Sequence, residues 1–265
     1  MRCKTLAIPI RATDYSDSSQ VVVLFSQKVG LLEGIAKGAY RPKSSFDGPF
    51  DLAVLYDVIY LQRRSANGVS PASGLAILAE STVLDGFRRL RSAWERHLAA
   101  SHVLEFLRIV ATHGEDAGEL FPLVVDTFHE LEIRSQKDLG AILLRFDLRA
   151  LRILGLLPPV TACVSCGRVW PPSQSPVFFS SRAGGLVCRY CRRDEPRMRG
   201  VKLSGRAIRI LQHLSQNEPL DFTGELRDDW ENQRHLVTRT VRDLRNSLLE
   251  RELNVLSDIG ALTLS

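Results

Sequence analysis

Four cysteines occur in two pairs, Cys163-Val-Ser-Cys166 and Cys188-Arg-Tyr-Cys191, with 21 residues between the pairs. Each Cys-x-x-Cys pair can form a tight turn that presents two thiolates to one metal ion, and two such turns complete a tetrahedral site. Gly167 suits the first turn because glycine tolerates positive φ. Four protein ligands leave no position open for water or substrate. The spacing therefore predicts one structural zinc ion rather than a catalytic one.

Two other states also use four cysteines, namely an iron–sulfur centre and a pair of disulfides. Five cysteines in 265 residues is not the density of a disulfide-stabilised chain, and Cys3 stands alone. The first residues contain no apolar signal core, and no later run approaches the about 18 apolar residues of a membrane helix. We therefore expect a cytoplasmic protein without membrane contact, in a reducing compartment where paired cysteines bind metal.

The positive charge is concentrated around and just after the cysteines. The net charge is +5, yet residues 160–210 carry ten Lys and Arg against two Asp and Glu, whereas residues 211–265 carry six against ten. The ten cations are Arg168, Arg182, Arg189, Arg192, Arg193, Arg197, Arg199, Lys202, Arg206 and Arg209. Four thiolates on one zinc ion leave a charge of −2, which accounts for about two or three of them. The surplus predicts a polyanionic partner.

The first 81 residues have the pattern of strands separated by turns. Apolar and β-branched runs predict strands at 5–11, 20–26, 31–37, 50–61 and 75–80. In the fourth run, Leu52, Val54, Tyr56, Val58 and Tyr60 share one face. Five short strands within about eighty residues favour a small closed barrel such as the OB-fold.

From about residue 82 onward the apolar periodicity becomes helical. It predicts helices at 87–99, 103–112, 120–131, 138–156, 204–215 and near 233–251. In the fourth helix Arg145 and Arg149 lie opposite the apolar stripe. The predicted fold is α+β, with an N-terminal five-stranded OB-fold barrel at 1–81. A mostly helical domain follows at 82–265, with an inserted four-cysteine zinc module at about 160–195.

Common catalytic motifs are absent from the sequence. It contains no Gly-x-x-x-x-Gly-Lys-Ser/Thr loop, no His-Glu-x-x-His and no Gly-x-Ser-x-Gly. The six histidines, His102 among them, occur singly in or beside helical segments, as ordinary surface or boundary residues do. We expect no enzymatic activity.

A second group of cations lies in the strand-rich half. Lys37-Gly-Ala-Tyr-Arg41-Pro-Lys43 combines three cations with a tyrosine and a glycine. Surfaces that bind single strands need cations that follow the phosphates and aromatic rings that stack on bases. Acidic residues are interspersed here, so ordinary surface loops remain the alternative. The predicted DNA contacts are Arg11, Lys28, Lys37, Arg41, Lys43, Arg63 and Arg64 in this half, and Arg189, Arg192 and Arg193 beside the cysteines.

Three segments, in this order, resemble the RecO recombination mediators. The first runs from Gly30 to Ser44, with Phe46 just beyond. The second is Leu-Arg-Phe-Asp-Leu-Arg-Ala-Leu at 144–151, leading to Leu-Gly-Leu-Leu-Pro at 154–158, and the third is the two cysteine pairs. The resemblance spans nearly the whole chain and is weakest beyond about residue 210. It implies an OB-fold, a helical body with an inserted zinc module, and a DNA-repair role without catalytic turnover.

The resemblance also implies partners. Such proteins bind single- and double-stranded DNA, anneal complementary strands, and act with RecR to load recombinase on DNA coated by single-strand-binding protein, in the bacterial cytoplasm at the nucleoid. Cys163, Cys166, Cys188 and Cys191 match the zinc ligands, and Lys37, Arg41 and Lys43 match the basic N-terminal run. The acidic C-terminal tail of single-strand-binding protein is expected in an apolar groove rimmed by arginines such as Arg145 or Arg149.

One departure from the family pattern concerns the turn at Gly30. The family often has a basic residue after this glycine, and here Leu31 and Leu32 follow it. The departure shifts the expected DNA contact toward the arginine-rich zinc segment.

Two other function classes fit parts of the sequence. One is a zinc-ribbon adaptor in transcription or ribosome assembly, in which the basic segment binds RNA or protein. The other is a nuclease or ligase-like enzyme with an accessory OB-fold. Such an enzyme needs a metal-binding carboxylate cluster or a nucleotidyl lysine motif, and the sequence shows neither.

Overall fold

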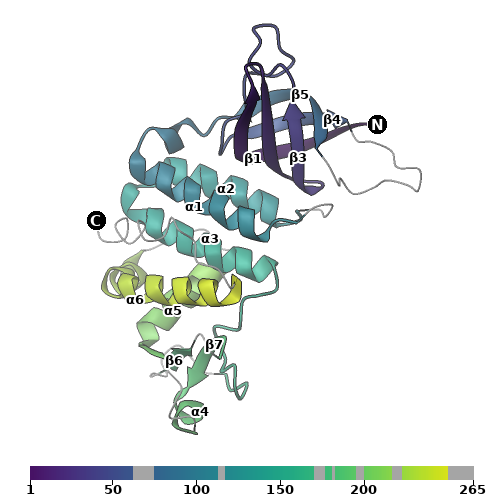
Figure 1. Cartoon of the computed structure of the whole chain (residues 1–265). Coiled ribbons are helices and arrows are strands. Elements are labelled where there is room, and N and C mark those ends of the chain that lie inside the picture. The colour runs from purple at the N-terminus through teal and green to yellow at the C-terminus, as the bar shows by residue number, and fades with distance from the viewer. Residues whose placement is uncertain are drawn as a thin grey trace, which may run out of the picture. The chain divides into compact units, whose positions relative to one another are not determined.

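The computed structural model describes residues 1–61, 75–112, 117–169, 177–180, 183–194, 200–216 and 223–249. The chain forms two compact units, Met1–Arg134 and Ser135–Ser265. The first unit holds a barrel and two helices, and the second holds the remaining helices and a small sheet (Figure 1). The domain boundary near residue 81 stays a prediction.

The N-terminal strands form the predicted closed five-stranded barrel. They are β1 (Arg2–Ser16), β2 (Ser19–Ser26), β3 (Gly30–Ala36), β4 (Leu55–Leu61) and β5 (Ala76–Asp85). Their order around the barrel is β1-β2-β3-β5-β4, and antiparallel pairing of β4 with β1 closes it. Only β3 and β5 pair in parallel among these neighbours. This is the strand order of an OB-fold.

A glycine allows the parallel pair to approach closely. Gly34 of β3 lies opposite Ala76 of β5, and a Cβ atom at position 34 would lie 2.6 Å from Leu78 Cδ2. Real carbon atoms do not pack this closely, so the position requires glycine.

The fourth strand is shorter than the sequence predicts. Tyr56, Val58 and Tyr60 are buried as expected, but β4 begins only at Leu55. Ala53 has a φ of 53°, which interrupts an extended run. The segment before it is instead fastened to Gln20, whose Oε1 accepts from Phe50 N at 2.8 Å and whose Nε2 donates to Phe50 O at 3.3 Å. The predicted start at residue 50, and Leu52 on the buried face, were therefore wrong.

Two helices complete the first unit. The stretches predicted at 87–99 and 103–112 are one helix, α1 (Trp94–Val110), which follows a 3-10 turn, η1 (Arg88–Arg91). The expected break is absent, and Ala100 and His102 lie buried within the continuous helix. His102, at 0% exposure, is thus a core residue and not a surface one. The predicted helix at 120–131 is confirmed as α2 (Leu120–Ile133).

Helix α3 (Leu139–Ile153) is the central helix of the second unit, packed against α5 (Gly205–Ser215) and α6 (Gly224–Leu249). Helix α6 begins nine residues before the predicted start at 233, in a polar stretch whose periodicity is weak. Arg145, expected on the solvent face of α3, is only 5% exposed. Helix α3 is therefore buried on more sides than a single apolar stripe indicates.

A buried ion pair joins α3 to α6. Arg245 Nη1 lies 2.7 Å from Asp147 Oδ2, and the two side chains are 0% and 1% exposed. Arg245 Nη2 also donates to Asn246 Oδ1 at 2.9 Å. Two charges removed from water are tolerated only when they are paired and hydrogen-bonded, so each depends on the other.

Replacing Asp147 by alanine is expected to lower the free energy of unfolding by about 3 kcal/mol, because it leaves Arg245 charged and buried. The double variant Asp147→Leu, Arg245→Met should recover most of this loss, since neither charge remains. Urea unfolding followed by circular dichroism measures both. A single-variant loss below about 1 kcal/mol would show that water reaches the pair.

Candidate metal centre and nucleic-acid interface

The first cysteine pair lies in a short hairpin. Gly167 N donates to Cys163 O at 2.8 Å, and Cys163 N donates to Arg168 O at 3.0 Å. Gly167 has a φ of 69°, the positive value predicted from its position after the pair. A bridge between Ala162 and Val169 closes the hairpin. The turn holds Cys163 and Cys166 on the same side of the hairpin.

The second pair spans a strand end and a helix start. Cys188 ends β7 (Gly185–Cys188), and Cys191 lies in α4 (Arg189–Asp194). Strand β7 belongs to a three-stranded sheet with β6 (Val177–Ser180) and β8 (Val201–Leu203), in the order β7-β6-β8. Val164 N donates to Leu186 O at 2.9 Å, which fastens the first hairpin to β7. The backbone thus brings the two pairs together.

The four sulfur atoms lie within 4.8 Å of one another. All four cysteines are free, and Cys166 Sγ lies 3.9 Å from Cys188 Sγ, too far for a disulfide of about 2 Å. A tetrahedral ion at about 2.3 Å from each sulfur sets the sulfurs about 3.8 Å apart. Cys163 and Cys188 are buried, whereas Cys166 is exposed. The cluster is close enough to hold a metal ion.

The electrostatics of the cluster favour a cation. Burial raises the pKa of the Cys163 thiol, but hydrogen bonds from the backbone N–H groups of Cys188, Cys166 and Ser165 outweigh it and lower that pKa to about 6. Burial, followed by hydrogen bonding to the other three thiols, raises the pKa of Cys191. The Cys163 thiol therefore ionises readily, and a cation bound among the four sulfurs would stabilise that thiolate.

Two aromatic rings support the arginines beside the cysteines. The guanidinium carbons of Arg168 and Arg189 each lie 4.7 Å from the centroid of the Tyr190 ring. The guanidinium carbon of Arg192 lies 4.0 Å from the centroid of Phe178. Of the predicted DNA contacts in this segment, Arg189, Arg192 and Arg193 all belong to α4.

Two cations of the basic segment have an internal partner. Arg209 Nε donates to Asp229 Oδ2 at 3.2 Å, and Arg206 Nε lies 3.4 Å from Asp229 Oδ1. The Asp229 side chain is only 6% exposed. The basic segment therefore carries less unpaired charge than its sequence predicts, because no spacing signal connects α5 to Asp229 of α6. Arg182, Arg197 and Arg199 lie outside the described residues.

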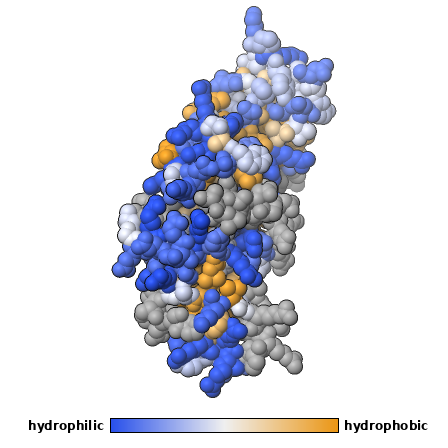
Figure 2. Space-filling model, turned by 90° about the vertical axis from the view of Figure 1, so that its left-hand side faces the viewer, coloured by the Kyte–Doolittle hydropathy of each residue, from blue (hydrophilic) through white to orange (hydrophobic). Residues whose placement is uncertain are grey.

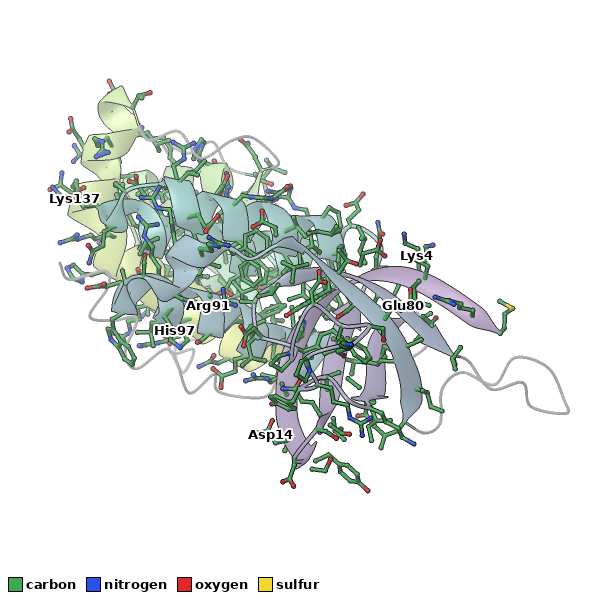
Figure 3. All side chains as sticks on the ribbon, turned by 90° about the horizontal axis from the view of Figure 1, so that it is seen from above. Lys4, Asp14, Glu80, Arg91, His97 and Lys137 are labelled. Carbon is green, nitrogen blue, oxygen red and sulfur yellow. The ribbon has the colours of Figure 1, made fainter. Side chains whose placement is uncertain are left out.

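The basic loop at 37–43 lies at one end of the barrel, beside the turn of the β1–β2 hairpin. Gly38 N donates to Ser19 Oγ at 3.4 Å, and Tyr40 N donates to Ser18 O at 3.3 Å. The Tyr40 hydroxyl donates to Asp14, which Figure 3 labels near the tip of that hairpin. This bond, more than burial, raises the pKa of Tyr40. The loop exposes the side chains of Lys37, Arg41 and Lys43.

The other predicted barrel cations lie elsewhere. Lys28 lies in the turn at the opposite end of β2, where its Nζ donates to Lys4 O at 3.1 Å. Arg11 lies opposite Val23 in the middle of β1. Arg63 and Arg64 lie outside the described residues. The structure therefore brings Lys37, Arg41 and Lys43 together but leaves Lys28 and Arg11 apart from them.

The exposed surface is largely polar. Figure 2 shows hydrophilic residues over most of one face, with apolar residues in small groups. Within the described ranges, no helix has the length and apolarity needed to span a bilayer.

Comparison with known proteins identifies two family segments. Residues 1–76 match the N-terminal domain of recombination protein O, and residues 91–256 match its C-terminal domain. The DNA repair protein RecO of Rhodopirellula baltica is 29% identical over 81% of this chain and 76% of its own length. The DNA repair protein RecO of Alkaliphilus metalliredigens is 31% identical over 72% of both chains. That of Anaeromyxobacter dehalogenans (strain 2CP-1) is 31% identical over 74% of this chain and 73% of its own.

The two segments correspond to the observed parts of the fold, since the first covers β1 to β4 and reaches the start of β5, and the second covers α1 to α6 and the cysteine cluster. The predicted resemblance is thus confirmed, and the chain belongs to the RecO family of DNA repair proteins.

Proposed function

We propose that this protein is a recombination mediator without enzymatic activity. It binds single- and double-stranded DNA, anneals complementary strands and, with RecR, helps load recombinase onto DNA coated by single-strand-binding protein in the RecF pathway. Membership of the RecO family across both the barrel and the helical region carries this proposal. Such activity would keep the protein at the bacterial nucleoid.

One structural zinc ion is held by Cys163, Cys166, Cys188 and Cys191 in this proposal. The close approach of all four sulfurs supports a single ion, because cysteines that bind different irons of a cluster lie farther apart. A bound zinc ion would cross-link the four cysteines rigidly and leave no coordination position open for a substrate. The cysteines then hold the first hairpin, β7 and α4 in one arrangement, which keeps the arginines of α4 in place.

Two groups of cations bind DNA in this proposal. The first is the barrel loop with Lys37, Arg41 and Lys43, all exposed around Tyr40. The second is α4 with Arg189, Arg192 and Arg193. Contacts of this type neutralise phosphates and release counterions, and they carry no sequence information. Binding is therefore independent of sequence and strongly dependent on salt.

Annealing follows from this kind of binding. Two strands repel each other through their phosphates, and a surface that neutralises both lets complementary bases meet. No bond is broken or made in the process, so no catalytic residue is needed. Asp229, the buried carboxylate nearest the basic segment, is occupied by Arg206 and Arg209.

The acidic tail of single-strand-binding protein needs a different place from the one predicted. A groove rimmed by Arg145 is wrong, because that side chain is buried. A pocket of about 310 Å³ lies between the end of α3 and α5, lined by Leu157, Pro158, Gln212 and the exposed Arg152. Its apolar wall and cationic rim suit a short acidic peptide with an apolar end, and we assign the tail to it.

A fluorescence annealing assay tests the proposed function. Complementary oligonucleotides carrying a donor and an acceptor dye are mixed alone, with this protein, and after coating with single-strand-binding protein that has or lacks its tail. We expect faster annealing with the protein, and faster annealing of coated strands only when the tail is present. Unchanged rates on bare strands would refute the proposal. RNA binding without DNA annealing would instead support the adaptor function.

A further inference from the structure

We propose that the metal module binds nucleic-acid phosphates through arginines held by aromatic rings, with Tyr190 and Phe178 as positioning residues. This inference rests on the proposed DNA binding and goes beyond it. It adds Arg168 and Lys202 to the contact surface, and it gives the two rings a role that is not base recognition.

Tyr190 organises two arginines at once. Its ring is 47% exposed, and the guanidinium carbons of Arg168 and Arg189 each lie 4.7 Å from the ring centroid. These two carbons are therefore at most twice that distance apart, within reach of one phosphate or of two successive phosphates. Arg189 Nη2 also donates to the Tyr190 hydroxyl at 2.6 Å. An arginine held on a ring loses less side-chain entropy on binding than one moving freely in water.

Phe178 gives a second support of the same kind. The guanidinium carbon of Arg192 lies 4.0 Å from its ring centroid. Phe178 pairs directly with Lys202 across β6 and β8, and paired residues project from the same face of a sheet. Lys202 is exposed. One ring is therefore flanked by two cations that reach solvent.

The aromatic partners of the arginines in the metal module leave guanidinium N–H groups available to bind phosphate. Arg206 and Arg209 share the carboxylate of Asp229, whereas among the described residues Arg168, Arg189 and Arg192 have ring partners. A ring contacts the flat face of a guanidinium, while the N–H groups point outward along its edge. These edges can bind phosphate oxygens in pairs. Three arginines of the module are thus ordered by aromatic rings and not by a carboxylate recorded in the described chain.

The same geometry argues against base stacking. A base that stacked on Tyr190 or Phe178 would have to displace a guanidinium group from the ring. The rings therefore act as supports, and the ligand is the phosphate backbone of single- or double-stranded nucleic acid. Removing bases from the ligand is expected to leave this contact intact.

The test replaces Tyr190 by leucine and by phenylalanine in the full chain. Neither change alters the formal charge. Tyr190→Leu is expected to weaken binding of a fluorescent single-stranded oligonucleotide about fivefold, because two arginines lose their ring. Tyr190→Phe keeps the ring and should bind within about twofold of the unmodified protein. Trp94→Leu is the matched control, since Trp94 is an exposed aromatic at the start of α1, outside both proposed DNA contacts and with no arginine recorded over its ring in the described chain.

Other measurements distinguish a positioning role of Tyr190 from an effect on the stability of the protein. Metal content and melting temperature should be the same in Tyr190→Leu and Tyr190→Phe, whereas the affinity should differ. The Tyr190→Leu change should lower the affinity for an oligonucleotide with abasic sites by the same factor as it lowers the affinity for a normal oligonucleotide. Equal affinities of the leucine and phenylalanine variants, or a loss that disappears with abasic DNA, would overturn the inference.

The inference and the proposed function fail in different ways. If the unmodified protein binds no oligonucleotide, the proposed function fails with it. If it binds, and Arg189→Gln weakens binding while Tyr190→Leu does not, only the positioning role of Tyr190 is refuted.

Discussion

Replacing Cys188 by serine is expected to remove the bound metal and unfold the metal module. Metal binding and folding are one event in small modules of this kind, where zinc contributes about 10–16 kcal/mol at neutral pH. The module has little else to stabilise it, because its sheet is three short strands with the apolar side chains of Val177, Phe179, Leu186 and Leu203. Elemental analysis should fall from one zinc per chain to almost none. Limited proteolysis should then cut within residues 160–200.

Cys3→Ser is the matched control for this prediction. Cys3 is a free cysteine at the start of β1, in the other compact unit from the four clustered sulfurs. It should keep one zinc per chain and resist proteolysis in the module. Iron in the unmodified protein, or no metal in freshly purified reduced protein, would contradict the zinc assignment.

Neutralising the barrel loop is expected to weaken single-stranded DNA binding about 500-fold at about 50 mM salt, because three lost phosphate contacts remove about two released counterions. The variant is Lys37→Gln, Arg41→Gln, Lys43→Gln, and all three side chains are exposed, so the barrel should stay folded. The slope of log affinity against log salt should become shallower by about two. Fluorescence anisotropy across a salt series measures both.

A triple variant with the same change in charge is the control. Lys137→Gln, Arg239→Gln, Arg242→Gln removes three exposed cations outside the two proposed surfaces, and two of them lie 3.7 Å from Asp243. Net charge alone would weaken binding equally in both variants. A loss confined to the loop variant places the contact there, whereas equal losses would contradict a local interface.

The barrel and the cysteine cluster were predictable because their signals are local. The β-branched apolar run of β2, the alternating residues of β4 and the two Cys-x-x-Cys pairs are each recognised from neighbours in the sequence. The late start of the fourth strand, at Leu55 rather than at residue 50, was not predictable in this way. The positive φ of Ala53 and the bonds between Gln20 and Phe50 depend on the folded barrel.

The arginines of the second unit show where charge patterns mislead. Arg245 lies four residues after the buried Val241 of α6 and is itself fully buried against Asp147. That spacing, together with a carboxylate inside the apolar α3, was a signal for the pair. Arg206 and Arg209 offered no such signal, because Asp229 reaches them only through tertiary packing of α5 and α6.

The most direct measurement is the affinity of the unmodified full chain for a fluorescent oligonucleotide of arbitrary sequence at rising salt. If about five phosphates are contacted, affinity should fall about a hundredfold between about 50 and about 200 mM salt. It should change little when the base sequence is scrambled. No binding at the lowest salt, or affinity that stays constant as salt rises, would contradict a protein that binds DNA through its phosphates.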